Sequence, residues 1–124
     1  MKNISVLFVC LGNICRSPAA EAIFLNLIEK KGVQDNFFVD SAGTGSWHVG
    51  KNADSRMYIA AKQRNISIVS KARQIDKEDF HKFNYILAMD NSNFQNLINF
   101  RNRESLSNFS KIKKIQDFAS LHNA

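Results

Sequence analysis

Hydrophobic positions fall into short runs that are separated by polar segments along the chain. The first run, residues 5–9, is nearly continuous and predicts a strand that is buried on both faces, as in a parallel sheet. Similar runs at residues 37–41 and 85–89 predict a second and a third strand. A weaker fourth strand is expected from residue 112 to residue 115 or 117.

Helix signals stand between these runs. Ser17 can cap a helix, Pro18 suits its first turn, and Gly32 is a plausible stop after Lys31. The remaining expectations are a helix capped by Asp54 or Ser55 that ends near Arg64, a short extended stretch at residues 66–69, a short helix from Asp76 to Lys82, and a helix capped by Asn91 or Ser92 that ends near Arg101. This alternation predicts an α/β fold in which helices cover both faces of a parallel sheet.

Three polar or reactive residues follow or end the predicted strands. Cys10, Ser41 and Asp90 stand at the carboxyl ends of the first, second and third strand, respectively. Ligands of parallel α/β sheets bind at this edge. We therefore expect the functional site here, beside a long loop at residues 42–50.

The length of 124 residues is that of one compact domain, and a single proline, Pro18, leaves no linker that would divide residues 1–124. No apolar run approaches the roughly 20 residues that span a bilayer. The apolar run near the N-terminus is too short for a signal peptide. These features predict a cytoplasmic protein without a membrane partner.

The charge balance is basic, with 17 Lys and Arg against 11 Asp and Glu, a formal net charge of +6. Such a balance suggests nucleic acid, but the basic residues are scattered and not interleaved with aromatic ones. A positive field suits a phosphorylated ligand equally well. The chain has two cysteines, Cys10 and Cys15, which are too few for a disulfide framework. Its histidines are dispersed, which does not favour a metal site. We expect no nucleic-acid partner and no metal.

The loop between the first strand and the first helix carries the candidate chemistry. A loop that enters a helix N-terminus gathers backbone N–H groups, which favour an anion there. Gly12 and Asn13 tolerate the positive φ of a tight cradle, and Arg16 offers a planar fork to two phosphate oxygens. Such surroundings favour a thiolate at Cys10, to which Ser17 could donate its hydroxyl. The loop predicts phosphate binding and in-line attack of Cys10 on phosphorus.

The string Val9–Pro18, with its Cys-x5-Arg-Ser pattern, closely resembles the low-molecular-weight protein tyrosine phosphatases. The resemblance covers roughly residues 5–118 and continues in Asp40–Thr44, Trp47–His48, Ala72–Ile75, Asp79–Phe80 and Met89–Asp90. It implies a flavodoxin-like fold with four parallel strands, a cysteinyl-phosphate intermediate and no cofactor. The implied substrates are phosphotyrosine proteins or aryl phosphates, and the implied product is inorganic phosphate.

The resemblance also implies roles for single residues. Cys10 would be the nucleophile, Arg16 would bind phosphate and stabilise the transition state, and Ser17 would support the thiolate. The expected substrate-binding residues are Leu11, Gly12, Asn13, Ile14 and Cys15 of the loop, of which Asn13 holds its conformation, and Trp47 as a wall of the phenol pocket. Cys15 would match a second loop cysteine that pairs reversibly with Cys10 under oxidation, or is a buried small hydrophobe. Asp90 would anchor the surroundings of the site or cap a helix.

Two departures from the family pattern stand out. The family's general acid lies in an Asp-Pro dipeptide, which is absent because Pro18 is the single proline. We therefore expect a C-terminally truncated domain with impaired activity, an exposed apolar patch in place of a C-terminal helix, and Asp117 as a candidate substitute acid. Ser70 stands where the family usually has a histidine that braces the loop asparagine.

Four alternatives stay open. The first is a catalytically weak module that binds phosphate or phosphopeptides. The second is a protein-arginine phosphatase of the same fold, which carries Thr in place of Ile14. The third is an arsenate reductase, which needs further cysteines, although none follows Cys15. The fourth, nucleic-acid binding, rests on charge alone.

Overall fold

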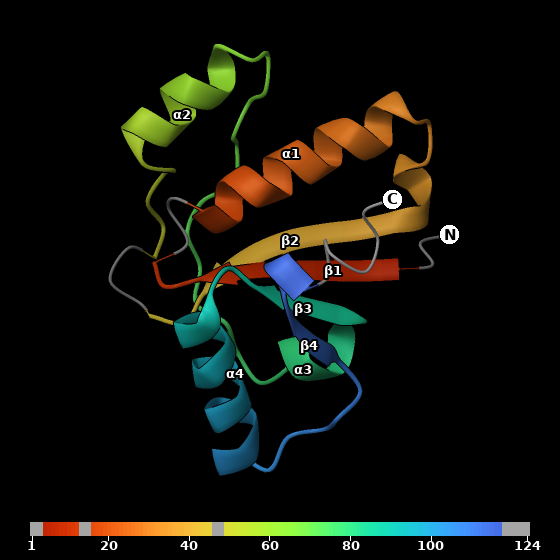
Figure 1. Cartoon of the computed structure of the whole chain (residues 1–124), viewed down its shortest axis with the longest axis vertical. Helices are drawn as coiled ribbons and strands as arrows, with labels where there is room; N and C mark the ends of the chain where they lie inside the picture. Colours follow the sequence, from red (N-terminus) through yellow and green to blue (C-terminus); the bar gives the residue numbers. More distant parts are fainter. Residues whose placement is uncertain (1–3, 13–15, 46–48, 118–124) are drawn as a thin grey trace.

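The computed structural model describes residues 4–12, 16–45 and 49–117, and a four-stranded parallel sheet forms its centre (Figure 1). The strand order is β2-β1-β3-β4. The strands are β1 (Ile4–Cys10), β2 (Phe37–Gly43), β3 (Tyr85–Ala88) and β4 (Lys111–Lys114). The predicted flavodoxin-like α/β fold with four parallel strands is therefore confirmed.

Helices cover both faces of this sheet. They are α1 (Arg16–Lys30), the short 3-10 helix η1 (Gln34–Asn36), α2 (Ser55–Lys62), α3 (Asp79–Lys82) and α4 (Asn91–Arg103). Figure 1 shows α1 and α2 on one side of the sheet, and α3 and α4 on the other. In the described parts of the chain, every helix is too short or too polar to cross a membrane.

The central strand β1 is buried on both faces. Leu7 and Val9 pack into the cluster that holds Phe80 of α3 and Leu97 of α4. The intervening residues face the opposite cluster, in which Phe24 of α1 is packed. Because side chains alternate between the two faces of a strand, a continuous apolar run is what this position requires. The carboxyl end of β1 is thereby fixed between two packed layers.

The N-terminal end of α1 differs from the expectation, whereas its C-terminal end agrees with it. The helix begins at Arg16, so Ser17 lies inside the helix, and the prediction that it caps the helix is wrong. Its hydroxyl contacts Cys10 instead. At the other end, Gly32 stops the helix as predicted, with a positive φ of 71°. The N–H groups of Gly32 and Val33 donate to the last carbonyls of the helix.

An aspartate directly precedes and caps each of the helices α2 and α4. Asp54 caps α2, as one of the two predicted alternatives, and accepts a hydrogen bond from the backbone N–H of Met57. Asp90, rather than Asn91 or Ser92, caps α4. Its carboxylate accepts from the N–H of Asn93 at 2.7 Å. The predicted end near Arg101 is two residues short of the observed end of α4 at Arg103.

Two of the three shorter predictions need correction. The α-helix expected from Asp76 begins at Asp79, because the N–H groups of Phe80 and His81 donate three residues back, as in a turn. Asp76 still enters this segment as predicted, since its carboxylate accepts a hydrogen bond from the N–H of Asp79. Residues 66–69 belong to no helix or strand, and the extended stretch expected there stays a prediction. Strand β4 ends at Lys114, and residues 115–117 have helical backbone where the strand was expected to continue.

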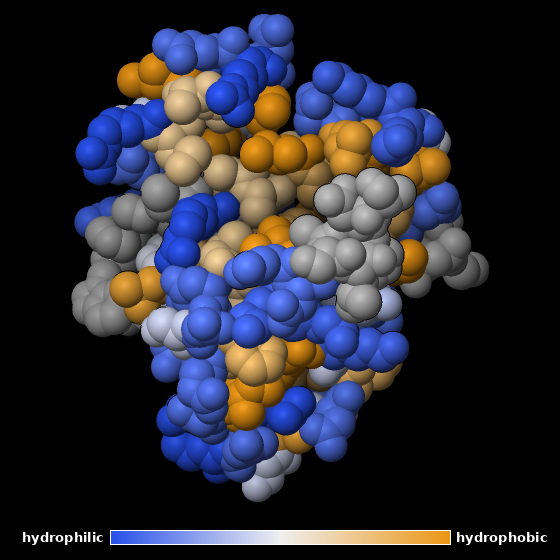
Figure 2. Space-filling view, viewed as in Figure 1, coloured by the Kyte–Doolittle hydropathy of each residue, from blue (hydrophilic) through white to orange (hydrophobic). Residues whose placement is uncertain are grey.

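An apolar hollow of about 370 Å³ lies on the α1 face of the sheet. Its described lining includes Val6, Phe8 and Leu87 of the sheet, Phe24 of α1, and Ile115 beyond β4. Figure 2 shows hydrophobic side chains at the surface over α1 and α2, the two helices on this side of the sheet. Val6, Phe8 and Leu87 are nonetheless buried, so the exposed apolar patch expected from the sequence stays a prediction.

Gly32 gives the first testable prediction. A β-carbon at this position meets nothing within 4 Å, so a substitution there changes only the backbone preference. We expect Gly32→Ala to lower the free energy of unfolding by about 1 kcal/mol, because the left-handed conformation is costly for alanine. Gly32→Asn should cost less, because asparagine tolerates this conformation. Urea unfolding measures both variants, and an alanine variant as stable as the parent would contradict the prediction.

Candidate active site

The candidate site begins where β1 meets α1. Cys10 ends β1, and its thiol is buried, with 4% of the residue exposed. Its Sγ lies 2.9 Å from the Oγ of Ser17 in the first turn of α1. A thiolate only accepts hydrogen bonds, so in that form the serine hydroxyl must be the donor. The Ser17 hydroxyl also lies 3.5 Å from the carbonyl oxygen of Ala42 in β2, to which it can donate only when it does not donate to the sulfur.

Arg16 begins α1 and Asp90 follows β3, and their side chains meet at the carboxyl edge of the sheet. The Nη1 of Arg16 donates to Oδ2 of Asp90 at 2.8 Å, and both side chains are partly exposed. The backbone N–H of Asn93 and, after it, the guanidinium of Arg16 lower the pKa of Asp90. Asp90 therefore stays a carboxylate that both caps α4 and holds Arg16. These are the two roles considered for Asp90 from the sequence.

Backbone hydrogen bonds join the start of the candidate loop to the segment after β2. The N–H of Thr44 donates to the carbonyl of Cys10 at 2.9 Å. The N–H of Gly45 donates to the carbonyl of Leu11, also at 2.9 Å. Leu11 itself is half exposed. The loop thus leaves β1 along the edge of β2.

Several predicted site residues lie outside the described part of the chain. These are Asn13, Ile14, Cys15, Trp47 and His48. The expected substrate contacts of the first three and of Trp47, and the reversible pairing of Cys15 with Cys10, stay predictions.

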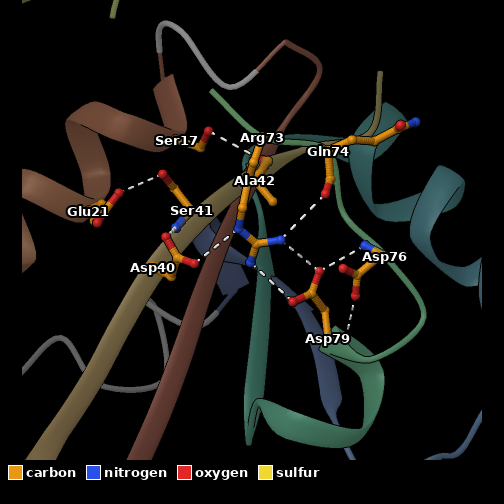
Figure 3. A network of polar contacts seen from close by, with 9 residues as sticks. All are labelled: Ser17, Glu21, Asp40, Ser41, Ala42, Arg73, Gln74, Asp76 and Asp79. Carbon is orange, nitrogen blue, oxygen red and sulfur yellow. Dashed lines mark hydrogen bonds and ion pairs between the residues drawn. The ribbon is translucent and has the colours of Figure 1, made fainter. Parts of the chain in front are cut away.

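A partly buried ion-pair network centres on Arg73, beside the carboxyl end of β2 (Figure 3). Arg73 donates from Nε to Asp40 of β2 at 3.0 Å. Its two terminal nitrogens donate to both carboxylate oxygens of Asp79, at 3.0 and 3.1 Å. Burial lowers the pKa of Arg73, but the bonds and charges of Asp79 and Asp40 outweigh it and raise that pKa. The network ties β2 to the start of α3.

The same network aligns the chain next to β2. The N–H of Gly43 donates to the carbonyl of Arg73, and the N–H of Ile75 donates to the carbonyl of Gly43, both at 2.8 Å. Residues 73–75 thus run beside the end of β2. The sequence indicated these residues only as part of the family resemblance, and it carried no sign of their mutual contact. The sequence signal that could have suggested this contact is the presence of opposite charges, Arg73 against Asp40 and Asp79, next to positions predicted to be buried and apolar.

Glu21 is a buried carboxylate that the sequence analysis missed. It lies one turn after Ser17 in α1, with 8% of the residue exposed. Ser41 of β2 donates its hydroxyl to Oε1 of Glu21 at 2.5 Å (Figure 3). Burial raises the pKa of Glu21, and hydrogen bonds from Ser41 and Ser70 oppose this shift. Ser70 therefore contacts Glu21, whereas its expected partner Asn13 lies outside the described residues.

Asp117, the candidate substitute acid, lies three residues after the end of β4, at the same carboxyl edge of the parallel sheet as Cys10. It follows β4, which is separated from β1 by β3, and two strand spacings amount to about 10 Å. Its carboxylate is well exposed and lies 3.7 Å from Nζ of Lys114. Proton transfer from Asp117 to a leaving group at Cys10 therefore stays a prediction.

A family model described as low molecular weight phosphotyrosine protein phosphatase matches residues 5–123. The phosphatase of this description from Schizosaccharomyces pombe is 53% identical over 97 residues, which cover 77% of this chain and 62% of that protein. The low molecular weight protein-tyrosine-phosphatase YfkJ of Bacillus subtilis is 45% identical over 116 residues, 93% of this chain and 72% of YfkJ. The chain spans about three fifths of the length of the first of these relatives.

Solved structures agree with these matches. A protein tyrosine phosphatase from Entamoeba histolytica, solved with Hepes in its active site, has a TM-score of 0.84 and 43% identity over 93% of this chain and 72% of its own. The Drosophila arginine phosphatase DARP has a TM-score of 0.87 and 41% identity over 97% of this chain and 74% of its own.

Glu21 gives the second prediction. Because folding raises its pKa above 4.5, its contribution to stability is present below that pH and is lost as pH rises through the folded pKa. Gln keeps an oxygen that can accept from Ser41 but carries no charge. We expect Glu21→Gln to gain stability relative to the parent as the pH rises above 4.5. Denaturant unfolding from this pH upward measures the difference.

The matched control is Glu29→Gln, at an exposed position of the same helix. Its stability relative to the parent should change little over the same pH range. If Glu21→Gln and Glu29→Gln follow the same pH dependence, the buried carboxylate does not titrate as described.

Proposed function

The chain belongs to the low molecular weight phosphotyrosine protein phosphatase family, and we propose that it hydrolyses aryl phosphate monoesters, among them phosphotyrosine in proteins. The observation that carries this proposal is the contact of 2.9 Å between the buried thiol of Cys10 and the hydroxyl of Ser17. It lies at the junction of a buried strand and a helix N-terminus, which is a natural anion site. Arg16, anchored by Asp90, supplies a cation at the same edge.

In the first step, the thiolate of Cys10 attacks phosphorus in line with the bond to the aryl oxygen. An S–P bond forms, the P–O bond to the leaving group breaks, and the phenolate departs with its electron pair. Ser17 stabilises the thiolate before attack by donating its hydroxyl to the sulfur. The product of this step is a phosphocysteine at residue 10.

In the second step, water attacks the phosphorus of this phosphocysteine. A P–O bond forms, the S–P bond breaks, and the sulfur leaves as the thiolate that Ser17 again stabilises. The proton of the water passes to a phosphate oxygen or to solvent. Inorganic phosphate and the starting form of Cys10 result.

Arg16 is suited to bind the phosphoryl group through both steps. Its guanidinium presents several N–H donors in one plane, and the contact with Asp90 uses one terminal nitrogen. The carboxylate of Asp90 thus orients Arg16 from the side. Asp90 is a positioning residue in this scheme and not a proton donor, because its lowered pKa keeps it ionised.

Substrates differ in whether their leaving group must be protonated as the P–O bond breaks. Tyrosine has a pKa near 10, so its phenolate leaves poorly without protonation. General acid catalysis contributes typically 10²–10⁴-fold. A polypeptide of these 124 residues contains no Asp-Pro dipeptide, and the lowered pKa of Asp90 keeps that carboxyl ionised. We propose that such a polypeptide is an impaired enzyme for phosphotyrosine.

Arginine phosphatase activity is the second candidate. Its support is the likeness to DARP, which is about as strong as that to the Entamoeba histolytica phosphatase. Against it stands Ile14, where the arginine phosphatases carry threonine. Turnover of a phosphoarginine peptide faster than that of a phosphotyrosine peptide would favour this candidate.

The third prediction compares p-nitrophenyl phosphate with phosphotyrosine. Nitrophenolate leaves without a proton, so we expect the 124-residue chain to hydrolyse its ester and to turn phosphotyrosine over about 10²–10⁴-fold more slowly. Cys10→Ser should abolish both activities, since the attacking thiolate is lost. Release of inorganic phosphate measures turnover for each substrate.

The outcomes separate the candidate functions. Comparable turnover of both substrates would contradict the impairment and require a proton donor. Phosphate binding without Cys10-dependent turnover of either ester would contradict the enzyme and favour a phosphate- or phosphopeptide-binding module.

A further inference from the structure

A groove of about 360 Å³ leads away from the candidate catalytic loop. Leu11 and Thr44 lie at its loop end, Gln74 on one side, and Asn96, Asn99 and Arg103 of α4 on the other. We propose that this groove binds the polypeptide next to the phosphorylated residue of a protein substrate, with an acidic side chain placed at Arg103. The inference rests on the proposed function and adds to it the class of substrate sequence.

The position of the groove connects it with the reacting thiol. Leu11 directly follows Cys10, and its carbonyl accepts the N–H of Gly45, another lining residue. A substrate segment that leaves the loop on this side therefore enters the groove. Figure 1 shows α4 running away from the carboxyl edge of the sheet, so that the helix forms a long wall.

The length of the groove fits a short extended peptide. Asn96, Asn99 and Arg103 are spaced three and four residues apart, so they lie on one face of α4. A helix rises 1.5 Å per residue, which puts about 10 Å between the first and the last of them. An extended chain advances about 3.3 Å per residue, so about three peptide residues span this distance.

The polar groups of the groove match a peptide backbone. A peptide offers alternating N–H donors and carbonyl acceptors, and side-chain amides provide both kinds of partner. Gln74 extends away from the Arg73 network (Figure 3) and donates to the carbonyl of Thr44 at 3.3 Å. The amides of Gln74, Asn96 and Asn99 therefore offer the donors and acceptors that a peptide backbone needs.

The charge of the groove is positive at its far end. Arg103 is the charged residue among the described lining residues, and its guanidinium lies 5.3 Å from the ring centroid of Phe100, which also lines the groove. Its contact with Glu104 is long, at 3.6 Å, and Glu104 is closer to Lys77, at 3.0 Å. Arg103 is thus held against the groove by an aromatic ring and is suited to a carboxylate of the ligand.

The test uses two pairs of phosphotyrosine peptides. The two members of a pair differ only in a glutamate or a glutamine. This residue stands about three residues before the phosphotyrosine in one pair and about three residues after it in the other. The variant is Arg103→Gln, and the matched control is Arg101→Gln, which removes the same charge from the same helix outside the groove. We expect the parent to have a lower KM for the glutamate peptide in one of the two pairs. Arg103→Gln should reduce this preference about threefold, and Arg101→Gln should leave it unchanged.

A second measurement makes the inference independent of turnover. The same peptides with a non-hydrolysable phosphonate in place of phosphate are titrated against the parent and both variants by fluorescence anisotropy. Loss of the glutamate preference in Arg103→Gln alone supports the groove. An unchanged preference in Arg103→Gln, an equal loss in Arg101→Gln, or no preference in the parent overturns it.

These results are distinguishable from a failure of the proposed function. If p-nitrophenyl phosphate shows no Cys10-dependent hydrolysis, the proposed enzyme is contradicted, whereas the phosphonate peptides still report on the groove. If hydrolysis is present and the glutamate preference is absent, only the groove is contradicted.

Discussion

The contact between the Cys10 thiol and the Ser17 hydroxyl depends on how β1 is held. Leu7 and Val9 pack toward α3 and α4, and the alternate residues of β1 pack toward α1, so the strand has no exposed face. Its last residue is therefore fixed in position, and α1 begins close enough to place a hydroxyl beside the sulfur. A strand with one solvated face would leave the thiol free to shift, and an in-line attack tolerates little displacement.

The surrounding charges are arranged so that each has a defined task. Asp90 holds Arg16 at the open edge, where the guanidinium stays partly exposed. Arg73, in contrast, is engaged by Asp40 and Asp79 and holds β2 against the start of α3. Arg16 is thus available to a ligand, whereas Arg73 supports the fold. Breaking the second network would leave Asp79 as a buried, unpaired carboxylate, which is costly to the fold.

The sequence was sufficient for the elements that carry a strong local pattern. The continuous run of β1, the proline near the start of α1 and the stop at Gly32 follow from backbone geometry and side-chain alternation. The Cys-x5-Arg string placed Cys10 and Arg16 at one edge for the same reason. The assignment of Ser17 as a cap failed, because α1 begins one residue earlier.

Contacts between distant segments were beyond the reach of the sequence. Glu21 looks like an ordinary charged helix residue, and only the approach of β2 shows that it is buried against Ser41. Asp90 caps α4 and binds Arg16 at the same time, a combination that needs both strand ends in place. The groove along α4 depends on segments from four parts of the chain, so no local pattern indicates it.

The most direct measurement of the central claim is detection of phosphate on Cys10 itself. The chain is mixed with p-nitrophenyl phosphate, quenched within milliseconds, digested, and examined by mass spectrometry under conditions that preserve phosphocysteine. The account predicts a phosphate on the peptide that contains Cys10, which decays as inorganic phosphate appears and is missing from Cys10→Ser. Hydrolysis that proceeds without any phosphorylated Cys10 would contradict it.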